Sequence, residues 1–326
     1  MKHISAEAIK QGILLTELEK EQAEKQPIWD TLAVEDQIFV NGFGHGNNNV
    51  FTGDSETPVF TSAECDILAG RIVYLLSCLT ANGLGPAIID AGGMAYGGYN
   101  IAWTWGANNI NSDPYTDWYA EAYYRGTNEF PIALIQGETV ARARDRCIAE
   151  YNRWIEIWET ERADDSAAAA IIKFLIHDRD GLTVLGYLEA TLRTEPPESV
   201  VLSIESEPIP APVTLDGVPI TLPWTGEVPG GVHIIETPWI FQRDTTYYAF
   251  RHWENGSTKF RRAMWLDKDT SLKATFEETV AHNITVTSEP SEIEFAFDGE
   301  RYTTPYSELR EDGVYTIKFP LQFLRN

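Results

Sequence analysis

One stretch of β-type sequence occurs twice in the C-terminal third of the chain, and this repeat constrains the fold more than any other feature. LSIESEPIPAPVTLDG at residues 202–217 aligns with ITVTSEPSEIEFAFDG at residues 284–299, so the SEP and DG elements recur 82 residues apart. Short apolar runs between proline and glycine turns are typical of antiparallel β-sandwiches. We therefore predict two copies of one all-β sandwich module, at residues 200–281 and 282–326.

The second copy of this module is shorter than the first. The first copy continues beyond Arg243 through a further β-rich stretch, whereas the sequence stops at Asn326, where the equivalent stretch would begin. Half a sandwich leaves an unpaired strand edge and a bare apolar face. We therefore expect the chain to be a fragment of a longer protein or to complete the module by other means.

Residues 1–195 follow a different pattern. Short apolar runs such as QIFVNGF and RIVYLLSC alternate with helix-like stretches of about ten to twenty residues. This alternation predicts an α/β sheet with helices on its faces. The helical pattern at residues 137–177 is too long for one ordinary helix, and we expect it to break at residues 163–165. The change of pattern at TEPPES, residues 194–199, marks the domain boundary.

Composition narrows the classes of partner. The chain has 25 Lys and Arg against 49 Asp and Glu, a formal net charge of −24, which disfavours binding to a phosphate backbone. No apolar run reaches the roughly 18 residues of a membrane-spanning helix, and the charged N-terminus lacks the apolar centre of a signal peptide. We expect no nucleic acid partner and no membrane-spanning segment. The oligomeric state and the compartment stay open.

The sequence predicts no cofactor. Cys65, Cys78 and Cys147 are an odd number without a close pair, which argues against a disulfide scaffold or a zinc ribbon. The run HDRD at residues 177–180 has two interpretations: a tight turn, or a structural calcium site formed by Asp178 and Asp180.

A histidine and a cysteine follow two successive apolar strands. His45 lies between two glycines directly after the predicted strand that ends at Phe43, and Cys78 ends the next fully apolar run. In a parallel sheet, consecutive strands end at the same edge, where ligands and catalytic groups gather. We therefore expect His45 and Cys78 to face one another across one cleft.

This pair has a clear chemical use. An imidazole near a thiol favours the thiolate, which is the nucleophile, and can later protonate a leaving amine. Gly46 has no side chain, so its backbone N–H can come close to a substrate carbonyl as an oxyanion donor. The alternative interpretations are a turn residue for His45 and a buried core thiol for Cys78.

These residues carry a family resemblance. IFVNGFGHG followed by IVYLLSC resembles the clan CD cysteine peptidases, and among them the gingipain-type members, over roughly residues 30–195. The resemblance implies a caspase-like α/β/α sandwich in which Cys78 is the nucleophile, His45 the general base or acid, and Gly46 an oxyanion donor. The repeated modules resemble the immunoglobulin-like or PEGA-like domains of surface proteins, which favours an extracellular or cell-surface location.

The sequence departs from this family pattern in two places. Many relatives carry an acidic residue two positions before the cysteine, where this chain has Leu76. Caspase-like domains also carry strands and helices ahead of the histidine strand, and only 38 residues precede Phe39 here. We therefore expect the N-terminus to be truncated as well.

The expected activity is hydrolysis of peptide bonds through a thioester acyl-enzyme. Clan relatives often cleave after Arg, Lys, Asp or Asn, and the acidic surface favours a basic residue. Three residues are candidates for substrate binding: Trp103 and Trp105, in the position of a specificity-pocket wall, and Asp90, for a basic side chain. Strand packing for the tryptophans and a helix end for Asp90 are the alternatives.

Two other classes of function remain open. One is a catalytically inactive peptidase-like surface or scaffold protein that acts through its β-modules. The other is a signalling platform of the caspase-like type that moves a partner without cutting it, although no death-fold-like helical bundle accompanies the domain. Reactivity of the Cys78 thiol separates the peptidase from the scaffold.

Overall fold

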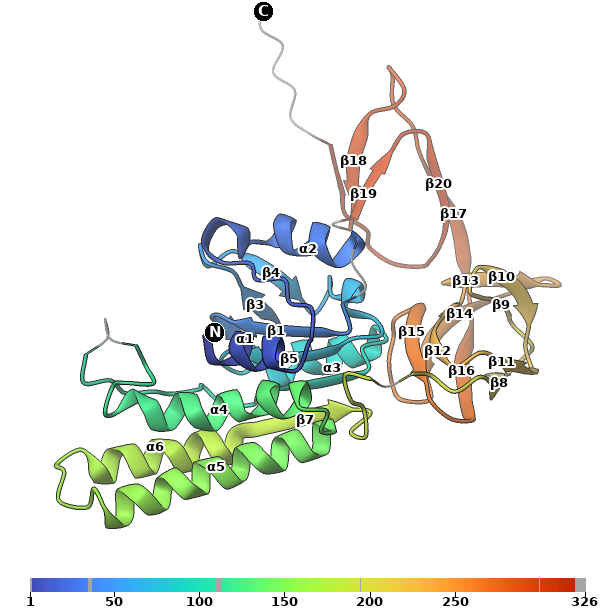
Figure 1. Ribbon diagram of the computed structural model, residues 1–326. Helices are drawn as coiled ribbons and strands as arrows, with labels where there is room; N and C mark the ends of the chain where they lie inside the picture. Colours follow the sequence, from blue (N-terminus) through green and yellow to red (C-terminus); the bar gives the residue numbers. More distant parts are fainter. Residues whose placement is uncertain (1, 35–36, 110–112, 194, 299, 320–326) are drawn as a thin grey trace, which may run out of the picture. The chain divides into compact units, whose positions relative to one another are not determined.

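A computed structural model describes residues 2–34, 37–109, 113–193, 195–298 and 300–319 of the chain (Figure 1). It divides into two compact units. The first comprises Met1–Val200, Pro229–His233 and Arg262–Lys268, and the second comprises Val201–Val228, Ile234–Arg261 and Asp269–Asn326. The first unit contains all the helices described and a mixed sheet, whereas the second is built from strands.

Six α-helices are described, all in the first unit. They are α1 (Lys2–Lys10), α2 (Lys25–Val34), α3 (Leu84–Asp90), α4 (Ala120–Ile135), α5 (Val140–Thr160) and α6 (Ala168–Gly181), with short 3-10 turns at Lys20–Gln22, Asp66–Leu68 and Thr80–Asn82. The predicted break in the long helical pattern is confirmed, because α5 ends at Thr160 and α6 begins at Ala168.

The central sheet of the first unit has four strands in the order β1-β5-β6-β7. These are β1 (Phe39–Phe43), β5 (Ile72–Leu76), β6 (Ala95–Tyr99) and β7 (Leu182–Gly186). β1, β5 and β6 run parallel, and β7 pairs antiparallel with β6. A small antiparallel sheet follows β1 and consists of β2 (Gly46–Asn47), β3 (Val50–Thr52) and β4 (Pro58–Thr61).

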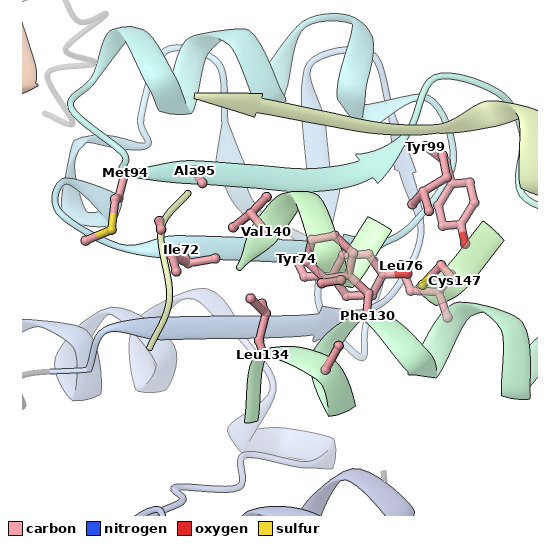
Figure 2. Close-up of a cluster of buried hydrophobic side chains, with 14 residues drawn as sticks. Ile72, Tyr74, Leu76, Met94, Ala95, Tyr99, Phe130, Leu134, Val140 and Cys147 are labelled. Carbon is pink, nitrogen blue, oxygen red and sulfur yellow. The ribbon is translucent and has the colours of Figure 1, made fainter. Parts of the chain in front are cut away.

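Both faces of the central sheet are covered. Every residue of β5 is buried, and its side chains alternate between the two faces, as the two-residue period of a strand requires. Tyr74 lies in a cluster with α4 and α5, where its ring stacks on Phe130 with centroids 4.5 Å apart (Figure 2). Val73 and Leu75 lie in a second cluster, with α2, α3 and the small sheet. The first unit is therefore a three-layer α/β structure, as the alternating sequence pattern predicts.

The described strands of the β-rich part, residues 200–298 and 300–319, pair mostly antiparallel. Its strands are β8 (Val200–Glu207), β9 (Pro212–Leu215), β10 (Val218–Thr221), β11 (Trp224–Val228), β12 (Gly231–Glu236), β13 (Ile240–Arg243), β14 (Thr246–Trp253), β15 (Arg261–Leu266), β16 (Thr270–Thr279), β17 (Ala281–Val286), β18 (Glu294–Phe297), β19 (Glu300–Thr303), β20 (Tyr306–Glu311) and β21 (Ile317–Lys318). Five of them form one sheet in the order β11-β8-β16-β14-β13, in which β8 and β16 run parallel. The prediction of a purely antiparallel module was wrong at this pair.

The sequence repeat is also a structural repeat. Asp216 and Asp298, 82 residues apart, both adopt the left-handed conformation, with φ of 51° and 49°. The carboxylate of Asp216 accepts a hydrogen bond from the Ile234 N–H at 2.8 Å, and that of Asp298 accepts one from the Thr316 N–H at 2.8 Å. Asp216 and Asp298 therefore share one backbone conformation and the same kind of side-chain hydrogen bond in the two copies.

Candidate active site

His45 and Cys78 lie at equivalent positions just after two neighbouring strands, β1 and β5. β1 and β5 pair in parallel with Phe43 opposite Leu76, so each candidate residue stands two positions beyond a matched pair. The Gly44 N–H donates to the Leu76 carbonyl at 3.2 Å, which extends the pairing toward both residues. Neighbouring strands are about 4.8 Å apart, so the two loops leave the sheet side by side. This is the carboxyl edge at which the sequence predicts the site.

Gly46 fits closely against the loop that carries the cysteine. A Cβ atom on Gly46 would lie 2.8 Å from Thr80 Cγ2 and 3.1 Å from Ser77 Cβ, closer than side-chain atoms normally approach. Ser77 and Thr80 flank Cys78 in the sequence, so the His45–Gly46 backbone packs directly on the cysteine loop. Only glycine allows this approach.

The direction of the Gly46 N–H follows from the register of the small sheet. The Thr52 N–H donates to the His45 carbonyl at 3.0 Å, and Gly46 is opposite Phe51 in the same ladder. Hydrogen-bonded and non-hydrogen-bonded pairs alternate in an antiparallel ladder, so Gly46 occupies a non-hydrogen-bonded position. Its N–H therefore points away from β3.

The cysteine loop is held in an unusual backbone conformation. Leu79, directly after Cys78, has φ of 63° in the left-handed region, which is rare for a bulky residue and clusters at functional sites. Beneath it, the Ser77 and Thr80 hydroxyls are 2.9 Å apart, and the Tyr96 hydroxyl donates to Thr80 at 2.8 Å. All three of these polar groups are buried. The buried network fixes the loop from below while leaving Cys78 only half-buried.

His45 is exposed and has a carboxylate partner. Its Nε2 lies 3.9 Å from Oε1 of Glu56, and the two side chains are 79% and 77% exposed. Glu24 anchors the Glu56 turn, because its carboxylate accepts hydrogen bonds from the Ser55 N–H at 2.6 Å and from the hydroxyls of Ser55 and Thr57. These bonds lower the pKa of Glu24, with that from the Ser55 side chain first. Glu56 was not identified from the sequence, because no motif or characteristic spacing links it to His45.

A segment that follows β6 forms the other side of the candidate site. We refer to residues 100–105 as the post-β6 segment. The Cys78 thiol donates to the Trp103 carbonyl at 3.8 Å, and the Leu79 N–H donates to the Ile101 carbonyl at 2.9 Å. Trp105 is 44% exposed, and its ring meets Tyr124 edge to face, with centroids 5.8 Å apart. Only the backbone carbonyl of Trp103 contacts Cys78. Its indole packs into the core, where Nε1 donates to the Tyr151 hydroxyl at 3.4 Å, as the strand-packing alternative has it. Trp105 lies two residues farther along the same segment.

Asp90 does not belong to this site. It is the last residue of α3, which begins near the cysteine loop and runs back along the sheet. Directly after it, the Gly92 carbonyl accepts from the Gly70 N–H at 2.8 Å, just before β5 begins. Asp90 thus lies at the amino edge of the strands, whereas Cys78 follows their carboxyl edge. The prediction that Asp90 lines the substrate pocket was wrong, because a helix after the cysteine returns the chain across the sheet.

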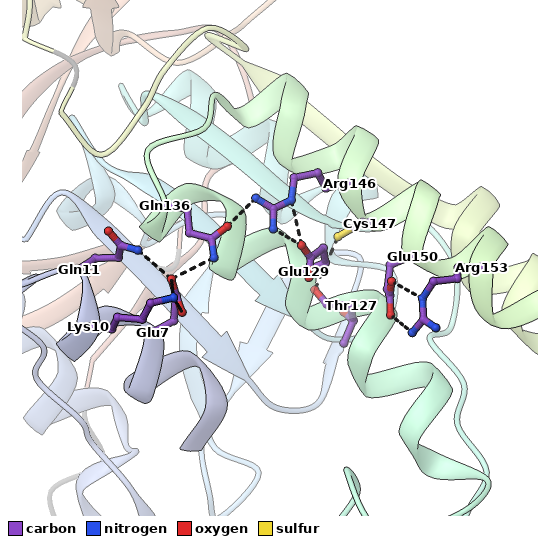
Figure 3. A network of polar contacts seen from close by, with 10 residues as sticks. All are labelled: Glu7, Lys10, Gln11, Thr127, Glu129, Gln136, Arg146, Cys147, Glu150 and Arg153. Carbon is purple, nitrogen blue, oxygen red and sulfur yellow. Dashed lines mark hydrogen bonds and ion pairs between the residues drawn. The ribbon is translucent and has the colours of Figure 1, made fainter.

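The other two cysteines are buried. Cys65 precedes a 3-10 turn and is 2% exposed. Cys147 lies on α5, where its thiol donates to the Thr127 carbonyl at 3.8 Å (Figure 3). Burial raises the pKa of Cys147 well above its ordinary value, which keeps it as an unreactive thiol. Cys78 is the one cysteine with partial exposure, and all three are described.

Asp178 and Asp180 do not form the tight turn considered from the sequence. Both lie on α6, which continues to Gly181. Asp178 is fully buried, whereas Asp180 is 61% exposed and pairs with Arg179 at 2.8 Å. The helix thus directs the two carboxylates to different surroundings rather than to one ion. No group of three or more His, Cys, Asp or Glu side chains in the described ranges could hold a metal ion.

Comparison with known proteins identifies no family for this chain, so a function must be argued from the geometry of the site. No protein-family model matches the chain, and no curated protein matches it. None of the helices in the described part of the chain has both the length and the apolar character needed to cross a membrane.

Proposed function

We propose that the first unit is a cysteine endopeptidase of the gingipain type, with a caspase-like fold and Cys78 as its nucleophile. One observation carries the proposal. The loops after β1 and β5 leave the sheet in register, and the glycine after His45 packs on the loop of Cys78. Such an arrangement supplies a base, a nucleophile and a backbone donor at one sheet edge.

The first half of the reaction forms the acyl-enzyme. His45 takes the proton of the Cys78 thiol, and the thiolate attacks the carbonyl carbon of the scissile peptide bond. The carbonyl oxygen becomes an oxyanion, and the Gly46 N–H donates a hydrogen bond to it. The C–N bond then breaks as His45 gives its proton to the leaving amine. The products are a thioester on Cys78 and a free amine.

The second half returns the thiol. His45 removes a proton from a water molecule, and the hydroxide attacks the thioester carbonyl carbon. The C–S bond breaks, the acid leaves, and the sulfur recovers a proton from His45. Cys78, His45 and water account for every bond and proton in this scheme, and no oxidant or reductant is required.

The residue before the cut is proposed to be arginine. Trp105 presents a half-exposed ring two residues beyond Trp103, whose backbone carbonyl accepts from the Cys78 thiol. A guanidinium group stacks on tryptophan, and the net charge of −24 attracts cationic substrates. Asp90 lies elsewhere, so the aromatic surface rather than a buried carboxylate would select the basic side chain.

The test is covalent labelling of the full chain. The probes are iodoacetamide and a peptidyl acyloxymethyl ketone that carries arginine, with mass spectrometry to locate the modified cysteine. Wild type is compared with Cys78→Ala, His45→Ala and the control variant Cys65→Ala. We expect saturable labelling of Cys78 by the peptidyl ketone, lost in C78A, reduced at least about 100-fold in H45A and unchanged in C65A.

Two results would count against the proposal. A Cys78 that reacts no faster than Cys65 and Cys147 means that the chain has no activated thiol and favours the inactive scaffold. Saturation with an aspartyl ketone but not with the arginyl ketone leaves the peptidase in place and removes the assignment of arginine.

A further inference from the structure

Asp178 is a buried carboxyl group whose protein partner lies in the post-β6 segment. Its Oδ1 accepts hydrogen bonds from the Thr104 N–H at 3.0 Å and from the Thr104 hydroxyl at 3.1 Å. Its Oδ2 is also buried, and within the described ranges no atom hydrogen-bonds to it. The side chain is fully buried, with a relative exposure of 0%. Burial of a carboxyl group with one oxygen unpaired lowers the stability of the fold, so its contact with Thr104 calls for an explanation.

The surroundings of Asp178 contain several hydroxyl groups and no cation that contributes to its pKa. Tyr99 on β6, Tyr123 on α4 and Tyr151 on α5 each interact electrostatically with it. Its neighbour on α6, His177, has its Nε2 3.0 Å from the Ala102 carbonyl. Desolvation raises the pKa of Asp178 to about 8, and the Thr104 hydrogen bonds only partly oppose this shift. Strongly shifted carboxyl groups concentrate at functional sites.

The segment that Asp178 holds is the one that touches the candidate nucleophile. Thr104 follows Trp103, whose carbonyl lies 3.8 Å from the Cys78 thiol, and precedes the exposed Trp105. The opposite end of the segment is fixed to α6 as well, since the Asn100 N–H donates to the Gly181 carbonyl at 3.0 Å. Helix α6 therefore sets the position of the backbone beside Cys78.

We propose that Asp178 is a positioning residue. Through Thr104 it holds the post-β6 segment beside Cys78 in place for a bound side chain. This role rests on the proposed function for its biological meaning, because the bound side chain is then that of a peptide substrate. Asp178 itself touches no reacting atom. Its effect is on how a bound side chain fits against the backbone of the post-β6 segment and the half-exposed ring of Trp105.

The experiment compares two alkylating reagents with the same reacting carbon. Iodoacetamide is small, whereas N-benzyliodoacetamide carries an additional aromatic ring, which tests the space beside the post-β6 segment. The rate constants at Cys78 are measured in the full chain for wild type, Thr104→Val, Thr104→Ser and the control Thr31→Val. Thr31 is a matched control because its hydroxyl also makes one hydrogen bond, to the Pro27 carbonyl at 2.9 Å, but it lies on α2 and not in the post-β6 segment.

We expect the benzyl-to-iodoacetamide rate ratio to fall at least about fivefold in T104V. The ratio stays within about twofold of wild type in T104S, which restores the hydroxyl, and in T31V. The iodoacetamide rate itself stays within about twofold in every variant. A ratio that is unchanged in T104V, or rates that fall equally for both reagents, would overturn the positioning role.

The second variant protects against loss of the fold. If T104V does not fold, Asp178→Leu removes the acceptor with an apolar side chain of similar size, and a folded D178L chain with a wild-type ratio overturns the proposal. Failure of the peptidase itself is a separate result. It shows as an arginyl ketone that never saturates, while the benzyl ratio still depends on Thr104.

Discussion

At the scale of single residues, the ionisation of Asp178 gives the clearest prediction. Burial raises its pKa to about 8, against about 4 in an unfolded chain. Between these values the unfolded carboxyl has lost its proton and the folded one has kept it, so the free energy of unfolding falls as pH rises. We expect wild type to lose stability relative to Asp178→Asn by up to about 1.4 kcal/mol per pH unit from about pH 4 to pH 8.

Denaturant titrations of both chains at several pH values measure this slope. Asp180→Asn is the control, because Asp180 is 61% exposed and its stability curve should run parallel to that of wild type. The amide in D178N leaves a buried NH₂ group with its own penalty, but that penalty does not vary with pH. Parallel curves for D178N and wild type would show that Asp178 is already ionised in the folded chain.

The pair of His45 and Glu56 predicts a small effect. Both side chains are more than three-quarters exposed, and His45 Nε2 lies 3.9 Å from Glu56 Oε1. Exposed ion pairs are screened by water and salt and contribute little. Glu56→Gln should therefore change the Cys78 labelling rate less than about fivefold. The opposite result is a Cys78 labelling rate that falls more than about tenfold in this variant, and that falls similarly in wild type at high salt. Glu56 would then be an orienting group for His45.

At the scale of elements, the contact between the two loops makes Gly46 a sensitive position. A methyl group there would lie 2.8 Å from Thr80 Cγ2 and 3.0 Å from the Val50 carbonyl oxygen. Overpacking of this kind typically costs about 1–3 kcal/mol and moves the neighbouring backbone. We expect Gly46→Ala to reduce Cys78 labelling by the arginyl ketone at least about tenfold, because the two loops must separate.

Gly106→Ala is the control for this change. Among the residues that the structure describes, its new methyl group would meet the Tyr123 hydroxyl at 3.9 Å and no other atom within 4 Å, so labelling should stay within about twofold of wild type. Thermal unfolding of both variants shows how much of the effect is stability. A G46A chain that labels as fast as wild type would contradict the close packing of the loops.

The elements of the site could be predicted from the sequence only where the signal is local. His45 and Cys78 each follow an apolar strand, and a parallel sheet brings such strand ends to one edge. Asp90 was misplaced because the direction of the short helix after Cys78 depends on its packing against the sheet. Asp178 was noticed only in a run that resembled a turn, since its contact with Thr104 joins residues 74 positions apart.

At the scale of the whole molecule, the sequence repeat made the matching backbone conformation of Asp216 and Asp298 predictable. The turns at Asp216 and Asp298 could be matched in the sequence, because a DG pair favours the left-handed conformation found at both aspartates. The parallel pairing of β8 with β16 could not, because the partner of a strand depends on long-range packing rather than on its own residues. Local turn chemistry was thus more informative than strand order.

The division into two units predicts that the modules can be weakened without altering the site. Asp216→Ala and Asp298→Ala each remove an equivalent side-chain hydrogen bond to a backbone N–H, at 2.8 Å in both copies. Each variant should lose roughly 0.5–1.5 kcal/mol of stability, because both hydrogen bonds are exposed and water can replace the lost acceptor. Hydrogen exchange should therefore speed up near Ile234 in D216A and near Thr316 in D298A. His45, Gly46 and Cys78 all belong to the first unit, so the iodoacetamide rate at Cys78 should stay within about twofold of wild type. A large change in that rate, with exchange altered only in the β-rich part, would mean that the modules act on the site.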